Sequence, residues 1–155
     1  MTVWTPSPEI ATKVIGLAWR GREMLVAEVE ESDGRIKGVR PLGGSIDFGE
    51  TREAALAREF EEELGCAIML TGPWHTFENL YEHEGVPGHE FIFAAAIGLG
   101  DEEIYRRDRF HYLEHEGTRC CAVWLDPLKL PPGVELYPSG LLQAIEEGRI
   151  PVPCA

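Results

Sequence analysis

The sequence predicts an α/β fold in which a mixed β-sheet packs between helices. Segments rich in β-forming residues precede and follow a central amphipathic helix, and a second short helix is expected near the end of the chain. The 155 residues, 44% of them apolar, suit one domain with one core. We expect residues 1–10 to form a loose arm, residues 11–150 a single domain and residues 151–155 a tail.

The chain before the central helix is expected to form strands joined by turns. The expected strands cover residues 12–19, 24–29 and 38–42. The Arg-Gly-Arg-Glu segment at residues 20–23 is typical of a hairpin turn, and residues 30–34 form a second turn. The third strand leads directly into Gly43 and Gly44.

The central helix is expected from about Thr51 to Leu64. Thr51 is a suitable N-cap residue, because its hydroxyl can accept a hydrogen bond from a backbone N–H of the first turn. Leu56, Phe60 and Leu64 recur every four residues and form an apolar stripe that packs on the core. Gly65 can adopt the left-handed conformation that ends a helix.

The chain after the central helix is predicted to be extended, with one further helix. The expected segments are extended chain over residues 66–82 interrupted near Gly72-Pro73, a buried strand over residues 89–98, a strand over residues 120–125 and a helix over residues 139–147. Residues 102–109 are polar, and their pattern favours neither a helix nor a strand. The alternation of strands and helices supports the sheet-and-helix architecture.

Charge and cysteine content limit the function classes. The net charge of −13 argues against nonspecific binding to a nucleic acid polymer or an anionic membrane. Four cysteines without a Cys-x-x-Cys pair are expected to be reduced thiols (Cys66, Cys120, Cys121 and Cys154). The sequence has neither a signal-peptide pattern nor an apolar run of 18 residues, so we expect a cytoplasmic protein.

Three carboxylates share one face of the predicted central helix. Glu59, Glu62 and Glu63 occupy relative positions 0, 3 and 4, which lie about one turn apart. They could form an ordinary solvated acidic face. A hard divalent cation such as Mg²⁺ would instead turn their mutual repulsion into ligation, since it binds carboxylate oxygens and keeps water ligands for a phosphate-bearing substrate. The glycine-rich entry to the helix favours such a metal-dependent phosphate site.

The same segment resembles the Nudix box, Gly-x5-Glu-x7-Arg-Glu-U-x-Glu-Glu-x-Gly-U, where U is a bulky aliphatic residue. All seven fixed positions are filled within 23 residues: Gly44, Glu50, Arg58, Glu59, Glu62, Glu63 and Gly65. The departures are Phe60 and Cys66 at the two aliphatic positions, and both residues are apolar. The resemblance implies a Nudix-type α/β/α sandwich and a Mg²⁺-dependent hydrolase, in which Mn²⁺ can substitute.

The resemblance also implies roles for the box residues. Glu59, Glu62 and Glu63 would be the metal ligands and catalytic carboxylates, with the backbone carbonyl of Gly43 as a further ligand. Four residues would support the site: Gly44, Glu50, Arg58 and Gly65. Arg58 and Glu50 would pair and hold the glycine loop against the helix. Nudix enzymes place the general base either in the box or on a downstream loop, where Glu116 is our first candidate and Glu114 the second.

The substrate is less well defined. The reaction implied is hydrolysis of a diphosphate bond in a nucleoside diphosphate linked to another moiety, with nucleotide sugars, dinucleotides and nucleoside triphosphates as the options. Candidate substrate contacts are Arg40 for a phosphate, Phe77 and Tyr81 for stacking on a base, and Glu90 at the pocket wall. The alternative from another class is a non-catalytic module that senses a nucleotide. A homodimer is among the oligomeric states the sequence allows.

Overall fold

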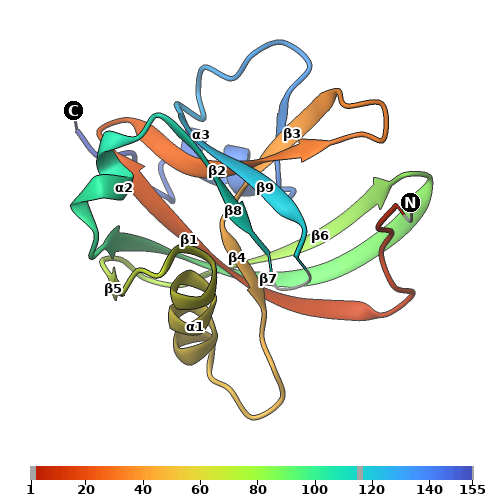
Figure 1. The fold of residues 1–155 in the computed structure, drawn as a ribbon, viewed down its shortest axis with the longest axis horizontal. Coiled ribbons are helices and arrows are strands. Elements are labelled where there is room, and N and C mark those ends of the chain that lie inside the picture. The colour runs from red at the N-terminus through yellow and green to blue at the C-terminus, as the bar shows by residue number, and fades with distance from the viewer. Residues whose placement is uncertain (1–2, 115–116, 155) are drawn as a thin grey trace.

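The structure is a computed structural model that describes residues 3–114 and 117–154. In this part of the chain it contains a ten-stranded mixed sheet and three helices (Figure 1). In chain order the elements are β1 (Ile10–Arg20), β2 (Glu23–Glu30), β3 (Ile36–Pro41), β4 (Gly43–Ser45), α1 (Arg52–Leu64), β5 (Ile68–Leu70), β6 (His75–His83), β7 (Val86–Leu99), α2 (Glu102–Arg106), β8 (Arg109–Leu113), β9 (Arg119–Leu125), β10 (Glu135–Leu136) and α3 (Leu141–Glu146).

The long strand β1 organises the sheet. It runs parallel to β7 from the Ile10–His89 pair to the Ala18–Ile97 pair, and it pairs antiparallel with β2 only at its C-terminal end. β6 and β5 pair with β7 on its other side, whereas β3 and β9 flank β2 and β8 pairs with β9. Because β1 contributes to both groups of strands, the sheet is curled rather than flat.

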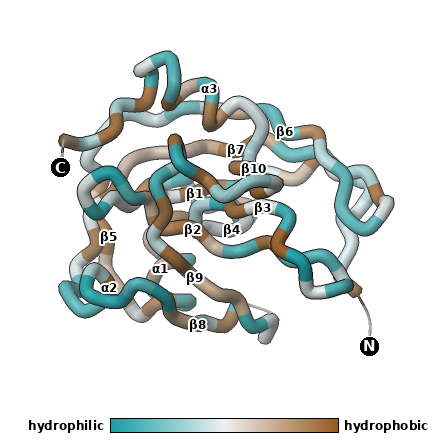
Figure 2. The backbone as a smooth tube through the Cα atoms, turned by 90° about the horizontal axis from the view of Figure 1, so that it is seen from above, coloured by the Kyte–Doolittle hydropathy of each residue, from teal (hydrophilic) through white to brown (hydrophobic). Residues whose placement is uncertain are grey.

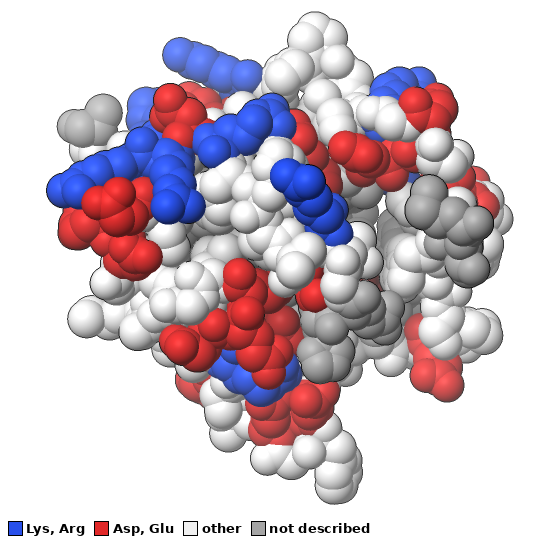
Figure 3. Space-filling model, in the orientation of Figure 1, with Lys and Arg blue, Asp and Glu red and all other residues white. Residues whose placement is uncertain are grey.

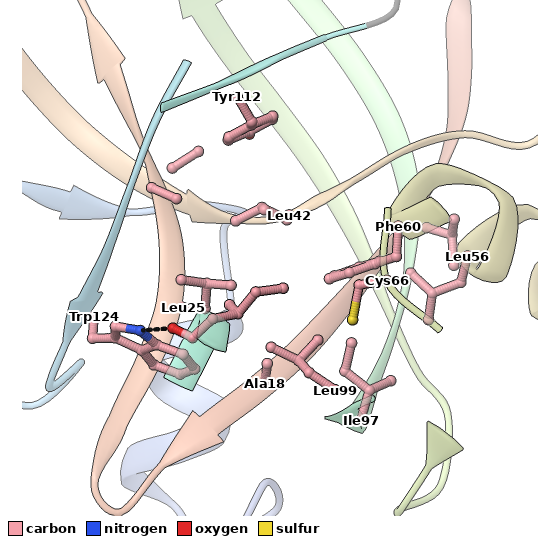
Figure 4. Packing of buried hydrophobic residues seen from close by; sticks show 14 of the residues in the cluster. Ala18, Leu25, Leu42, Leu56, Phe60, Cys66, Ile97, Leu99, Tyr112 and Trp124 are labelled. Atoms are coloured by element: carbon pink, nitrogen blue, oxygen red, sulfur yellow. Dashed lines mark hydrogen bonds between the residues drawn. The ribbon is translucent and has the colours of Figure 1, made fainter. Parts of the chain in front are cut away.

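Two apolar clusters hold helices on the two sides of the sheet. Leu56 and Phe60 of α1 join Cys66, Ile97 and Leu99 in one cluster, and Figure 4 shows these side chains pointing toward one another. The second cluster contains Leu141, Ala144 and Ile145 of α3 packed on inward residues of the strands. Figure 2 shows the apolar positions concentrated along the central strands. The predicted α/β/α arrangement is therefore confirmed, with a strongly curled sheet.

The segment that the sequence left unassigned, residues 102–109, contains two elements. Asp101 caps α2 by accepting a hydrogen bond from the N–H of Glu103, and α2 ends after Arg106. β8 begins at Arg109, only three residues later. Trp124 of β9 holds α2 in place, since its indole N–H donates to the carbonyl oxygen of Ile104 at 3.3 Å (Figure 4). A one-turn helix followed immediately by a strand leaves too few residues for either periodicity to be recognised.

Candidate active site

Helix α1 presents its carboxylates in a fixed orientation because both of its ends are capped. The hydroxyl of Thr51 accepts a hydrogen bond from the N–H of Ala54 at 3.1 Å, as the sequence predicts. Gly65 ends the helix with a φ of 60°. Leu56 and Phe60 are fully buried, so the helix cannot rotate without exposing them. Figure 3 shows acidic side chains gathered over α1, with a basic side chain among them.

Arg58 binds several oxygen atoms of this site. Its Nε and Nη2 donate to the two carboxylate oxygens of Glu50 at 2.7 and 2.8 Å, which is a bidentate pair. Nη2 also donates to the carbonyl oxygen of Ser45 at 3.0 Å, and Nη1 lies 3.0 Å from Oε1 of Glu59 and 3.4 Å from Oε2 of Glu62. The expected contact between Arg58 and Glu50 is therefore present and connects the loop to the helix.

The Arg58 contact controls the charge of Glu50. The hydrogen bonds from Arg58, and then the one from the backbone N–H of Asp47, lower the pKa of the Glu50 carboxyl to about 2. The same hydrogen bonds with Glu50 raise the pKa of Arg58. Both side chains are therefore charged across the physiological pH range, and the glycine-containing loop is held closed on itself.

Gly43 and Gly44 allow the loop to approach the helix and strand β1 closely. A side chain at Gly44 would overlap the carboxylate of Glu59, and one at Gly43 would overlap the carbonyl oxygen of Val14. Glu59 is only 8% exposed, and its carboxylate lies against Gly44 of the loop. The two glycines are therefore required by space rather than by an unusual backbone angle.

The surroundings of Glu63 disfavour the charged form of its carboxyl. Burial, followed by the charges of Glu59 and Glu114, raises the pKa of its carboxyl to about 8, although Arg40 opposes this shift. A divalent cation bound by these carboxylate oxygens would offset their mutual repulsion. In the described part of the chain, however, no three His, Cys, Asp or Glu side chains stand in an arrangement that could hold a metal ion. The donor set fits a hard cation, but Glu59 and Glu62 would have to turn away from Arg58.

The opposite wall of the site is formed by the sheet. Arg40 of β3 forms an ion pair with Glu114, which follows β8. Burial opposes the charge of Arg40, yet its neighbours, first Tyr112 and then Glu114, raise its pKa. Tyr112 and Cys120 pair across β8 and β9, and burial raises the pKa of the Cys120 thiol to about 12. The sequence did not single out Tyr112, because the cross-strand register that places it on the same sheet face as Arg40 cannot be derived from local pattern.

Tyr81 and Glu90 lie on the neighbouring strands β6 and β7. Burial, followed by the charge of Glu90, raises the pKa of Tyr81 to about 12, and Arg40 opposes this shift. Asn79, a residue that the sequence did not single out, is 3% exposed and donates to Oε1 of Glu90 at 3.0 Å. Its own Oδ1 accepts a hydrogen bond from the N–H of Ser139 at 2.9 Å, which fixes the orientation of the amide. Glu90 is thus held as a hydrogen-bond acceptor.

Two of the expected site residues require separate comment. The ring of Phe77 is 7% exposed and belongs to the apolar cluster under α3, so it is not available for stacking on a base. The expectation for Phe77 is therefore corrected, because its strand turns this side chain into the core. Glu116, the first candidate for the general base, lies outside the described residues. Its position in the chain places it between β8 and β9.

Other surface features are separate from this site. An open hollow of about 470 Å³ lies between the turn after β2 and the segment before α3, and its lining mixes acidic residues with Arg35 and Lys37. It contains none of the box carboxylates. The four cysteines are free thiols. None of the helices that the structure describes has the length and apolar character needed to cross a membrane.

Comparison with known proteins agrees with the geometry. A family model described as NUDIX domain matches residues 10–142. Among solved structures, the E. coli ORF135 protein superposes with a TM-score of 0.54 at 22% identity, covering 92% of each chain. A MutT NUDIX hydrolase from Burkholderia pseudomallei gives a TM-score of 0.54 at 20% identity, covering 79% of this chain and 88% of the other.

A UDP-X diphosphatase gives a TM-score of 0.52 at 12% identity, covering 97% of this chain and 70% of the other. No curated protein sequence matches significantly. These identities establish a shared fold, and the family model extends over most of the chain. Family membership and the complete set of box carboxylates together support a pyrophosphohydrolase enzyme. The chain belongs to the Nudix family.

Proposed function

We propose that this protein is a Mg²⁺-dependent hydrolase that cleaves the diphosphate bond of a nucleoside diphosphate linked to another moiety. The observation that carries the proposal is the arrangement around Arg58, which holds Glu50, Glu59 and Glu62 beside a loop with no side chain at Gly43 and Gly44. A nucleotide-sensing module without activity would have no need for this complete carboxylate set. The UDP-X diphosphatase that shares the fold acts on a substrate of the proposed class by its name.

The box residues would have two roles, metal binding and positioning of the glycine loop. Glu59, Glu62 and Glu63, with the carbonyl of Gly43, would hold the metal, and Mn²⁺ would substitute for Mg²⁺. The bound ion would neutralise charge on the diphosphate and lower the pKa of a water molecule. Arg58 and Glu50 keep the loop in position beside the helix, so that only the side chains of Glu59 and Glu62 have to turn when the metal binds. Attack by water on phosphorus then depends mainly on positioning and electrostatics.

Substitution of the candidate residues would identify the general base. The candidates downstream of the box are Glu116 and Glu114, and the box alternative is Glu59. If Glu116 accepts the proton, Glu116→Gln lowers kcat and leaves the Mg²⁺ affinity nearly unchanged, whereas Glu59→Gln weakens both. Wild-type turnover in both Glu116→Gln and Glu114→Gln would exclude the loop and leave a box carboxylate, with Glu59 first, or Glu90.

A substrate panel tests the function directly. Nucleotide sugars, dinucleoside polyphosphates and nucleoside triphosphates are incubated with Mg²⁺ or Mn²⁺, and phosphate release is measured with and without added phosphatase. We expect metal-dependent turnover of at least one class and a fall in kcat of roughly 100-fold in Glu63→Gln. Binding of nucleotide without turnover of any substrate would instead favour the sensing module. A cytoplasmic location, a homodimeric state and the lack of a nucleic acid partner remain predictions from the sequence.

A further inference from the structure

Asn79 is a buried amide that fixes the position of Glu90. Of the amide and charged side chains that the structure describes, only Asn79 and Glu59 are buried. The side chain of Asn79 donates from Nδ2 to Oε1 of Glu90 at 3.0 Å, and its Oδ1 accepts from the backbone N–H of Ser139 at 2.9 Å. Because a backbone N–H can only donate, the amide oxygen must face Ser139 and the amide nitrogen must face Glu90. The carboxylate of Glu90 is therefore held in one orientation as a hydrogen-bond acceptor.

Glu90 has no positive partner within the described part of the chain. It forms no ion pair there, and Asn79 is the one side chain that donates a hydrogen bond to it. Glu114 of the same site differs, since it pairs with Arg40. The side chain of Glu90 is half-buried rather than covered, so its Oε2 can accept a hydrogen bond from a ligand. An oriented acceptor without a cation fits a neutral ligand group that carries N–H or O–H donors.

Tyr81 connects the position of Glu90 with the rest of the candidate site. Glu90 and Gly88 are two apart on β7, and Gly88 pairs with Tyr81 of β6, so these three residues share one face of the sheet. A side chain at Gly88 would overlap the ring of Tyr81, because the ring packs on the backbone there. Burial has the largest effect on the pKa of both Tyr81 and Glu63, which it raises, and the charge of Arg40 opposes both shifts. The face that carries Glu90 is therefore within range of an arginine that also acts on a box carboxylate.

The phosphate groups of a nucleotide are unsuitable partners for Glu90, because like charges repel. The neutral groups of a nucleotide that carry donors are the ribose hydroxyls and the N–H groups of the nucleobase. A hydroxyl both donates and accepts and can rotate about its bond, so it does not require an acceptor of fixed orientation. An amino group on a nucleobase has its N–H bonds in the plane of the ring. The rigid acceptor made by Asn79 and Glu90 therefore suits an amino group best.

We propose that Glu90 determines nucleobase specificity by accepting a hydrogen bond from an exocyclic amino group, with Asn79 as the residue that positions it. The inference rests on the proposed function, because the nucleoside belongs to the proposed substrate. A base that lacks the amino group, or carries a carbonyl oxygen in its place, leaves the acceptor without its donor and binds more weakly. The substrate class is therefore narrowed to conjugates of adenine, cytosine or guanine nucleotides, in preference to those of uracil or hypoxanthine.

Binding of matched nucleotides tests this preference without requiring turnover. The probes are α,β-methylene diphosphates of adenosine, cytidine and guanosine, each beside the analogue in which hydrogen replaces the amino group: purine riboside, 2-pyrimidinone riboside and inosine. They are titrated calorimetrically at saturating Mg²⁺. We expect the wild type to bind the amino-bearing member of at least one pair about tenfold more tightly, since one hydrogen bond to a charged group distinguishes the two.

Glu90→Gln should remove the preference. The new amide keeps an oxygen for the N–H of Asn79 but turns its nitrogen, which is a donor, toward the base. The ratio of the two affinities should therefore fall to about twofold or less. The melting temperature should stay near that of the wild type, because the position is half-buried and the hydrogen bond with Asn79 is retained.

Glu78→Gln is the matched control. Glu78 precedes Asn79 on β6, so its side chain lies on the opposite face of the sheet, where its Oε2 is 2.8 Å from Nε2 of His89. The substitution removes the same charge, and the preference should persist. Asn79→Leu tests the positioning role, because it keeps the charge of Glu90 and removes the amide that orients it. The preference should fall in Asn79→Leu, and an unchanged preference would overturn the positioning role.

The specificity role is overturned if the wild type binds no probe, if it shows no preference in any pair, or if the preference persists in Glu90→Gln or is lost equally in Glu78→Gln. A persisting preference with loss of turnover of every substrate in Glu90→Gln would instead make Glu90 the general base. The proposed function can fail separately. If the amino-bearing probes are preferred and no diphosphate is hydrolysed, the specificity role stands and the catalytic proposal is wrong. If diphosphates are hydrolysed and the members of each pair bind equally, the specificity role alone is wrong.

Discussion

The candidate site contains two arginines, and they differ in how many of their hydrogen-bond donors are used. Arg58 on α1 contacts Glu50, Glu59, Glu62 and the carbonyl of Ser45 through all three of its guanidinium nitrogens. Arg40 on β3 makes one hydrogen bond, to Glu114, within the described residues. A guanidinium whose N–H donors are all used within the protein supports the structure, whereas one with unused donors is available to a ligand. The comparison predicts separate effects on stability and on substrate binding.

Removal of Arg58 should have the largest effect. Arg58→Ala removes the guanidinium that contacts Glu50 and the nearly buried carboxylate of Glu59, and it releases the loop from the helix. Because removing one member of a partly buried ion-pair network is destabilising, we expect the melting temperature to fall by about 5 °C or more and kcat to fall roughly 100-fold. Calorimetry and steady-state kinetics check the two values.

Arg106→Ala provides the control for Arg58→Ala. Arg106 is exposed on α2, and among the described residues it pairs with Glu103 alone, so its removal should change the melting temperature by no more than about 1 °C. Lost activity in Arg58→Ala at an unchanged melting temperature would show that Arg58 acts on the substrate directly, and the distinction between the two arginines would not hold.

The two sides of the site also differ in how far the sequence predicts them. The α1 side follows from local chemistry: Thr51 and Gly65 define the helix ends, and the spacing of the box residues brings Glu50 to Arg58. The sheet side depends on long-range register. Tyr112 lies on the same sheet face as Arg40 only because three strand pairings connect their strands, and Phe77 turns into the apolar cluster under α3. Neither relation leaves a periodic signal in the sequence.

Replacement of Arg40 should separate binding from stability. Arg40→Gln removes a cation whose only hydrogen-bond partner in the described residues, Glu114, is partly exposed and can be solvated instead. We expect KM for the diphosphate substrate to rise about tenfold, with a change in melting temperature smaller than that of Arg58→Ala. Arg40→Lys, which keeps the charge but not the planar fork, should recover part of the affinity. A fall in melting temperature equal to that of Arg58→Ala would place Arg40 in the framework.

The pH dependence of stability sharpens the comparison further. The folded protein lowers the pKa of Glu50 from 4.5 to about 2, mainly through the hydrogen bonds of Arg58. A group with a depressed pKa stabilises the protein above its unfolded pKa, and this contribution is lost as the pH falls toward the folded value. Wild type and Glu50→Gln should therefore differ in melting temperature at pH 7 and converge between about pH 4.5 and pH 2. The difference should shrink at high salt, since this pair is accessible to solvent. A constant difference over the whole pH range would contradict the ion pair.

Glu61→Gln should have the smallest effect of all, and it makes the larger effects interpretable. Glu61 lies on α1 between the box carboxylates, is exposed, and its backbone carbonyl accepts the capping hydrogen bond from Gly65, which the substitution preserves. The change removes one negative charge from the same helix as Glu62→Gln and Glu63→Gln. We expect kcat, KM and the melting temperature to stay within about twofold and 1 °C of the wild type, as for surface positions without specific contacts. If Glu61→Gln lost activity like its neighbours, the losses would report the charge of the helix rather than ligation by particular carboxylates. If Glu61→Gln is active whereas Glu62→Gln and Glu63→Gln are inactive, the loss of activity depends on the position of the carboxylate on the helix. Such a dependence on position is expected when particular carboxylates bind a metal ion.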